Sequence, residues 1–134
     1  MPQKMDRLKV LLLSSQEPST DLLREILSRR VLLATAWNRE ELFHLLRTGR
    51  YDVFLCDWEF RGSDWKEVCS EIRQYDPDLP AIVVCRLAGE QEWIEVLEAG
   101  CFDILSVPYF DYLVLAVLEQ AVASREALSR RTAA

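Results

Sequence analysis

Residues 51–57 read YDVFLCD, an apolar run that ends in a carboxylate. An uninterrupted apolar run of this length is typical of a strand that is covered on both faces of a parallel sheet. In an open α/β sheet, the residues at the carboxyl ends of the strands line the binding crevice. The run therefore predicts a central strand that delivers Asp57 to a functional site.

Four further strands are predicted on the same grounds, at about residues 9–14, 31–36, 81–85 and 102–106. A helical pattern follows each strand, and the last one covers about residues 110–128. This alternation predicts an α/β fold with a doubly wound, five-stranded parallel sheet, that is, a (βα)5 flavodoxin-like three-layer sandwich. We expect strand order 2-1-3-4-5 and one domain over residues 1–134, with its core at about 9–128.

Local signals indicate the ends and faces of the helices. Asn38 and Glu41 have the spacing of a capping box, which begins the helix after the second strand. Gly49 is expected to end that helix in the left-handed conformation, and Gly100 is expected to be the C-cap of the fourth helix. Pro77 should stop the third helix, because it disfavours helical geometry in the residue before it. The inward faces are predicted to hold Leu22, Leu23, Ile26 and Leu27; Leu42, Leu45 and Leu46; Trp65, Val68, Cys69 and Ile72; and Ile94 and Leu97.

The composition excludes several classes of protein. The chain has 134 residues and a net charge of −6, so no nucleic-acid partner is expected. No apolar run approaches the length of a membrane span, and we expect a cytoplasmic protein with no membrane partner. Cys56, Cys69, Cys85 and Cys101 form no CxxC pair, so buried free thiols are expected rather than a zinc or redox site. His44 is the only histidine and lies away from the crevice, so no metal role is expected for it.

In order and spacing, three segments resemble the receiver domain of bacterial two-component response regulators. They are YDVFLCD at 51–57, DPDLPAIVV at 76–84 and EAGCFDILSVPY at 98–109. The resemblance covers about residues 9–128. In receivers, the aspartate of the third strand accepts a phosphoryl group from a histidine kinase, and the resemblance gives that role to Asp57.

The positions that hold Mg²⁺ in receivers are changed in this sequence. Two acidic residues at the end of the first strand usually hold the ion together with the acceptor aspartate, and the matching residues here are Ser14 and Ser15. The position that usually gives a backbone carbonyl to the ion is Glu59. Mg²⁺ prefers oxygen ligands that carry carboxylate charge, so the two serines weaken such a site. We therefore expect no cofactor, or Mg²⁺ only if phosphorylation is retained.

Three other positions also depart from the receiver pattern. Cys85 replaces the Ser or Thr that hydrogen-bonds the phosphoryl group, Val107 replaces the Lys that pairs with its charge, and Ile104 replaces the aromatic switch residue. Phosphoryl transfer depends on positioning and on charge stabilisation, and the loss of one donor at a comparable oxyanion site costs about 3 kcal/mol. Self-catalysed phosphorylation is therefore expected to be very slow or absent. The Val107–Pro108 bond is expected to be cis, as the matching bond often is in receivers.

Two kinds of compensation remain open. Glu17 or Glu59 can approach a metal ion in place of the missing acids. Arg61 or Arg86 can form a fork on Asp57 and imitate the charge-paired state without a phosphate. The alternative for each of these four side chains is a solvent-exposed position in a loop. The alternative for Asp57 is a structural or vestigial carboxylate.

The last predicted helix is apolar on more than one stripe. Its apolar residues are Leu113, Val114, Leu115, Ala116, Val117, Leu118, Ala121 and Val122. One stripe packs on the sheet, and the other is expected to be exposed, as interaction surfaces are. Trp93 should point partly outward on the fourth helix. We expect a homodimer or partner contact through Trp93, Tyr112 and the outer stripe, on the face formed by the helix at 91–99, the strand at 102–106 and the last helix.

Three functions compete on this evidence. The first is an atypical stand-alone receiver domain that contacts a histidine kinase or another signalling protein and has little or no phosphorylation at Asp57. The second is a receiver that still accepts a phosphoryl group on Asp57 through a rearranged Mg²⁺ site. The third is an unrelated flavodoxin-like module or enzyme, which is disfavoured because residues 14–18 cannot form a glycine-rich phosphate loop. We expect no enzymatic activity beyond slow self-phosphorylation and dephosphorylation.

Overall fold

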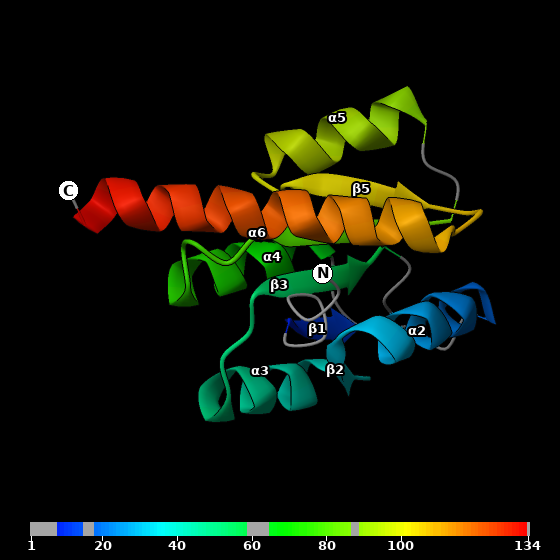
Figure 1. Cartoon of the computed structure of the whole chain (residues 1–134), viewed down its shortest axis with the longest axis horizontal. Coiled ribbons are helices and arrows are strands. Elements are labelled where there is room, and N and C mark those ends of the chain that lie inside the picture. Colours follow the sequence, from blue (N-terminus) through cyan, green and yellow to red (C-terminus); the bar gives the residue numbers. More distant parts are fainter. Residues whose placement is uncertain (1–7, 15–17, 59–64, 87–88, 134) are drawn as a thin grey trace.

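The computed structural model describes residues 8–14, 18–58, 65–86 and 89–133. Strands and helices alternate along this part of the chain (Figure 1). The strands are β1 (Lys9–Leu13), β2 (Leu32–Ala36), β3 (Val53–Asp57), β4 (Ala81–Cys85) and β5 (Asp103–Ser106). The helices are α2 (Pro18–Arg30), α3 (Arg39–Thr48), α4 (Trp65–Tyr75), α5 (Glu90–Glu98) and α6 (Asp111–Ala133). Each predicted strand and helix is present, although some ends are shifted.

The strands form one parallel sheet in the order β2-β1-β3-β4-β5, as predicted. In the register, Leu13 lies beside Cys56, and Asp57 lies beside Val84. Because parallel strands end at the same edge of a sheet, this register places the end of β1, Asp57 and the end of β4 next to one another. The fold therefore brings these strand ends together, as the sequence predicted.

Helices cover both faces of the sheet and bury β3 completely. On one face, α2 and α6 pack on the strands, with Leu23 and Leu118 in the same core cluster as Leu55. On the other face lie α3, α4 and α5, where Trp65 packs in the same cluster as Phe54. Figure 1 shows α6 lying along the direction of β5 and extending past the strands toward the C-terminus. All five residues of β3 are buried, and truncating one large core side chain to Ala typically costs about 2–5 kcal/mol. The strand that carries Asp57 is therefore held by the core itself.

The predicted start of α3 and the predicted end of α4 are both confirmed. The Asn38 side chain accepts a hydrogen bond from the Glu41 backbone N–H at 2.8 Å, and the Glu41 carboxylate accepts one from the Trp37 N–H at 2.9 Å. These bonds satisfy backbone donors that a helix start leaves without an intrahelical partner. α4 ends at Tyr75, just before the Asp76-Pro77 pair that was predicted to stop it.

The two glycines at helix ends behave differently from each other. Gly49 has φ −146° and ψ 176°, which is extended backbone, so the predicted left-handed conformation is wrong there. The chain leaves α3 directly toward β3 and needs no reversal at this point. Gly100 has φ 87°, which is left-handed, but the C-cap of α5 is Ala99, one residue earlier than predicted. The positive φ at Gly100 turns the chain from α5 back to β5.

Three predicted inward side chains are exposed. Leu22 of α2 is exposed, whereas Leu23, Ile26 and Leu27 are buried as predicted. On α5 the inward residue is Val96, and the prediction of inward Ile94 and Leu97 is wrong because both are exposed. α5 packs on β5, which is the edge strand, so this short helix buries a narrow stripe.

All four cysteines are free and buried, as predicted. Cys56, Cys69 and Cys101 come from β3, α4 and the segment before β5, and they meet in the core cluster that α3, α4 and α5 cover. A hydrogen bond with Cys69, together with burial, raises the pKa of the Cys101 thiol far above its ordinary value. Because the thiolate is the reactive form, these thiols act as core side chains.

The two glycines provide a matched test of the left-handed backbone. Gly100→Ala should lower the free energy of unfolding by about 1–2 kcal/mol, because an L-residue is strained at this φ. Its new methyl group would also meet the Arg73 guanidinium, which donates to the Ala99 carbonyl at 3.0 Å. Gly49→Ala should change that free energy by less than about 0.5 kcal/mol, because its φ suits any residue. Urea unfolding followed by tryptophan fluorescence measures both, and equal losses in the two variants would contradict this account.

Candidate functional site

The candidate site lies where β1, β3 and β4 end. Ser14, Asp57 and Cys85 are all buried there, with only 3% of Asp57 exposed. The Trp58 backbone N–H donates to the Val84 carbonyl at 2.8 Å, which continues the β3–β4 pairing past Asp57. From β1, the chain continues to β2 on one side, whereas β3, β4 and β5 follow one another on the other side. The direction in which strands are added therefore reverses between β1 and β3, and this is the topological switch point of the sheet.

Ser14 is held on the side of the site that faces α2. Its backbone N–H donates to the Ala36 carbonyl at 2.9 Å, and its hydroxyl lies 3.4 Å from the hydroxyl of Thr20. Both side chains are buried. Hydroxyl groups bring oxygen atoms into the site but no negative charge, so these two side chains are polar and neutral.

Tyr109 brings a third hydroxyl group to this end of the sheet. It follows the Val107–Pro108 bond, which is cis as predicted, and its side chain is 6% exposed. Burial, together with the smaller electrostatic effects of the Asp57 carboxylate and the Cys85 thiol, raises the pKa of Tyr109 to about 12. Tyr109 lies three residues past the end of β5, the strand next to β4, and so belongs to the same end of the sheet as Asp57. A neutral phenol therefore lies close to the carboxylate at working pH.

Sequence reasoning missed both Thr20 and Tyr109. Thr20 had a detectable signal, because it is spaced three and seven residues from Leu23 and Leu27 and so lies on the inward stripe of α2. Tyr109 had a weaker signal, since it follows a proline outside any strand. Its burial depends on how the start of α6 packs on the sheet, where it shares a cluster with Val114.

The other predicted site residues are dispersed. Ile104 is half-buried in β5 and packs against the core on the α5 face. Val107 and Arg86 are exposed. None of the ion pairs between described side chains involves Arg86.

Four of the predicted site residues lie outside the described residues. They are Ser15, Glu17, Glu59 and Arg61. The predictions for a second serine at the metal position, for compensating acids and for an Arg61 fork therefore stay predictions.

The described residues alone do not make a magnesium site. Asp57 contributes one carboxylate and Ser14 contributes a neutral hydroxyl. Within residues 8–14, 18–58, 65–86 and 89–133, no group of three or more His, Cys, Asp or Glu side chains is placed to hold a metal ion. Mg²⁺ takes near-octahedral oxygen coordination with carboxylate charge, which this corner does not supply.

A second feature is the exposed apolar surface on α5 and at the start of α6. Trp93 is 47% exposed and Tyr112 is 69% exposed, so both point outward as predicted. The Tyr112 ring stacks on the Phe110 ring with centroids 5.8 Å apart. α5 and α6 begin at the same end of the molecule (Figure 1). The exposed large apolar side chains of this surface are Trp93, Ile94, Leu97, Val107, Phe110, Tyr112 and Leu113.

No helix in the described part of the chain combines the length and the apolar character that crossing a membrane requires.

Comparison with known proteins gives a consistent result. The family model for the response regulator receiver domain matches residues 6–118. Response regulator MprA of Mycolicibacterium vanbaalenii is 31% identical over 97 residues, which are 72% of this chain and 39% of that protein. Transcriptional regulatory protein ZraR of Klebsiella oxytoca is 28% identical over 94 residues, which are 69% of this chain and 21% of that protein. The chain thus spans well under half the length of these two relatives.

Solved structures show the same fold. The crystal structure of a response regulator receiver domain protein from Clostridium thermocellum superposes with a TM-score of 0.78 and 16% sequence identity. The superposition covers 90% of this chain and 98% of that one. The chain thus shares its fold with this protein.

The phenol of Tyr109 predicts a pH dependence of stability. Its folded pKa of about 12 lies above the ordinary value of 10.0. The folded state therefore keeps the phenolic proton longer than the unfolded state does. The raised pKa therefore contributes to the free energy of unfolding. This contribution is fully present below about pH 10 and is lost as pH rises toward about 12, with a ceiling of about 2.7 kcal/mol.

Tyr109→Phe should remove this loss of stability at high pH. We expect the free energy of unfolding of the variant to fall less steeply than that of the wild type between about pH 9.5 and 11.5. Urea unfolding at a series of pH values measures the difference, and the other tyrosines and the cysteines contribute equally to both proteins. Parallel curves for the two proteins would show that Tyr109 is not buried beside Asp57.

Proposed function

The chain belongs to the response regulator receiver domain family of two-component signalling, and we propose that within it the chain is an atypical receiver. In this proposal it acts mainly by protein contact, and Asp57 is phosphorylated slowly or not at all. Receiver domains interact with histidine kinases and effector domains, and they are generally not enzymes. The proposed partner is a histidine kinase or another signalling protein.

The observation that carries the proposal is the environment of Asp57. This carboxylate has the position of a receiver acceptor, but Ser14 and Cys85, the described residues at two of the positions that assist it in receivers, carry no charge. Transfer of a phosphoryl group builds negative charge on the transferred oxygens, and catalysis depends on fixed positive charge and donors near them. Neutral hydroxyls and a thiol supply little of that stabilisation.

The exposed Val107 strengthens this interpretation. The matching lysine of receivers pairs with the phosphoryl charge, whereas a valine side chain supplies neither a charge nor a donor. We propose that the protein needs no tightly bound cofactor for its contacts. If phosphorylation is retained, Mg²⁺ is the expected cofactor.

The alternative is a receiver that accepts a phosphoryl group on Asp57 through a rearranged metal site. The burial of Asp57 at the switch point favours it, because the acceptor is placed where the fold puts it in receivers. Glu17 and Glu59 are the residues that could bring additional carboxylates. When bound, Mg²⁺ would neutralise part of the charge on the phosphoryl oxygens.

Intact mass separates the two functions. After incubation with Mg²⁺ and acetyl phosphate, under conditions that fully label an ordinary receiver, we expect no phosphoryl adduct on the wild-type chain. Asp57→Asn is the control for modification elsewhere. An adduct on the wild type that is missing from Asp57→Asn would overturn the proposal of an atypical receiver. It would establish instead a receiver that accepts a phosphoryl group on Asp57.

We further propose that contact is made through the surface on α5, β5 and α6, as a homodimer or with a partner. Large exposed apolar patches usually mark interfaces, and aromatic side chains dominate their binding energy. Trp93 and Tyr112 are the exposed aromatic side chains that fit this role best.

Trp93→Glu should weaken a homodimer by at least about tenfold in dissociation constant, since it places a charge in an apolar contact. Trp37→Glu is the matched control, because Trp37 is 40% exposed next to β2, at the other edge of the sheet. Sedimentation equilibrium over a concentration series measures both. A dimer that is unchanged in Trp93→Glu, or weakened equally by Trp37→Glu, would remove this surface from the proposal.

A further inference from the structure

A cavity of about 530 Å³ opens at the end of the sheet opposite Asp57. Its walls are the end of α3, the segment before β3, the end of α4 and the second half of α6. Cavities that hold small ligands measure about 300–1,000 Å³. This one therefore has room for a compact organic molecule, and it is separate from the receiver crevice.

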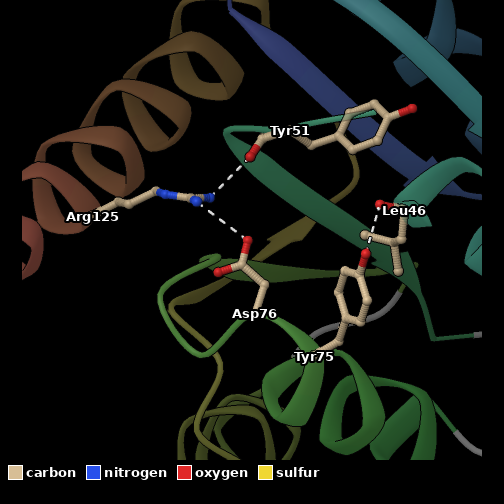
Figure 2. Close-up of polar contacts among 5 residues, drawn as sticks. All are labelled: Leu46, Tyr51, Tyr75, Asp76 and Arg125. Carbon is tan, nitrogen blue, oxygen red and sulfur yellow. Dashed lines mark hydrogen bonds and ion pairs between the residues drawn. The ribbon is translucent and has the colours of Figure 1, made fainter. Parts of the chain in front are cut away.

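Hydrogen bonds between distant segments hold the walls of this cavity in place. The Arg125 guanidinium donates to the Tyr51 carbonyl at 2.9 Å and to the Asp76 carboxylate at 3.2 Å. The Tyr75 hydroxyl donates to the Leu46 carbonyl at 3.2 Å. Figure 2 shows that these bonds tie α3, α4 and α6 together around one space. The site is thus built before any ligand arrives, which lowers the cost of binding.

The cavity is basic in an acidic protein. Arg47, Arg50 and Arg125 line it together with a single carboxylate, that of Asp76, whereas the whole chain carries a net charge of −6. The ion pair with Arg125 already offsets the Asp76 charge. Arg47 and Arg50 are exposed, and no hydrogen bond or ion pair between described side chains engages either one. Both guanidinium groups are therefore available to bind an anion. The planar arrangement of N–H donors in a guanidinium group matches the oxygen atoms of a phosphate.

Two tyrosine rings complete the lining. Tyr75 is 54% exposed although its hydroxyl is fixed on Leu46, so its ring offers a rigid flat surface. Tyr51 is half-buried, and its ring lies on the same side of the Arg125–Asp76 pair as the Tyr75 ring (Figure 2). Such a surface suits a flat ring, as bases stack on aromatic side chains in nucleic-acid complexes.

We propose that this cavity binds a small organic phosphate that carries a flat heterocycle, a chemistry that nucleoside monophosphates represent. Arg47 and Arg50 hold the phosphate, Tyr75 stacks on the ring, and the Arg125–Asp76 pair forms the fixed wall between them. The inference stands on the cavity alone and does not depend on the chemistry at Asp57.

Isothermal titration with AMP and GMP tests the proposal on the intact chain. Inorganic phosphate and adenosine are the two partial ligands. We expect one saturable site for at least one nucleoside monophosphate, with an affinity at least about tenfold higher than that of either partial ligand. No saturable binding with a Kd below about 1 mM, or equal affinity for inorganic phosphate, would overturn the proposal.

Variants locate the site. Arg47→Ala combined with Arg50→Ala should weaken binding by at least about tenfold without changing the thermal unfolding midpoint, because both side chains are exposed. Tyr75→Leu should weaken binding of the nucleotide but not that of inorganic phosphate. Arg30→Ala, which removes an exposed arginine at the end of α2, is the matched control. Binding that survives in the double variant, or that falls equally in Arg30→Ala, would place the ligand elsewhere.

Discussion

The structure depends on the burial of β3 on both faces of a parallel sheet. Val53 and Leu55 belong to one core cluster, and Phe54 and Cys56 belong to the other, so one strand joins the two halves of the interior. Parallel pairing then fixes where its last residue lies relative to β1 and β4. The position of Asp57 is therefore a consequence of core packing and would persist whether or not the carboxylate performs any chemistry.

This separation of position from chemistry means that the strand ends can meet in the same way whatever residues they carry. The core requires only that the strands end together, and Ser14 or Cys85 satisfies that requirement as well as any other residue. The chemistry requires fixed charges and donors around one carboxylate. Of the described residues at this end of the sheet, Ser14, Thr20 and Tyr109 bring hydroxyl groups, and the Tyr109 phenol keeps its proton because burial and Asp57 both disfavour its charged form.

Much of the fold was predictable because short sequence patterns determine where its strands lie and where its helices begin and end. The five apolar runs gave the strands, the Asn38 capping box gave the start of α3, and the Asp76-Pro77 pair gave the end of α4. The errors at Gly49 and on α5 arose because a local sequence signal was used where tertiary structure decides the outcome. At Gly49 the path of the chain toward β3 decides the backbone conformation, and on α5 the nearby sheet edge decides which side chains are buried. For the same reason, the strand carrying Asp57 could be predicted, whereas Tyr109 reaches the site only through tertiary packing.

The two ends of the sheet now carry different chemistry, and α6 links them. Its first turns hold the exposed Tyr112 and the buried Val114 near the Asp57 end, whereas Arg125 near its other end fastens Tyr51 and Asp76. A rigid helix that is packed on the sheet along Val114, Leu118 and Ala121 moves as a unit if it moves at all. A contact at either end therefore acts on an element that is shared with the other end. Coupling between distant surfaces needs such a shared element, and in this fold it exists independently of phosphoryl chemistry.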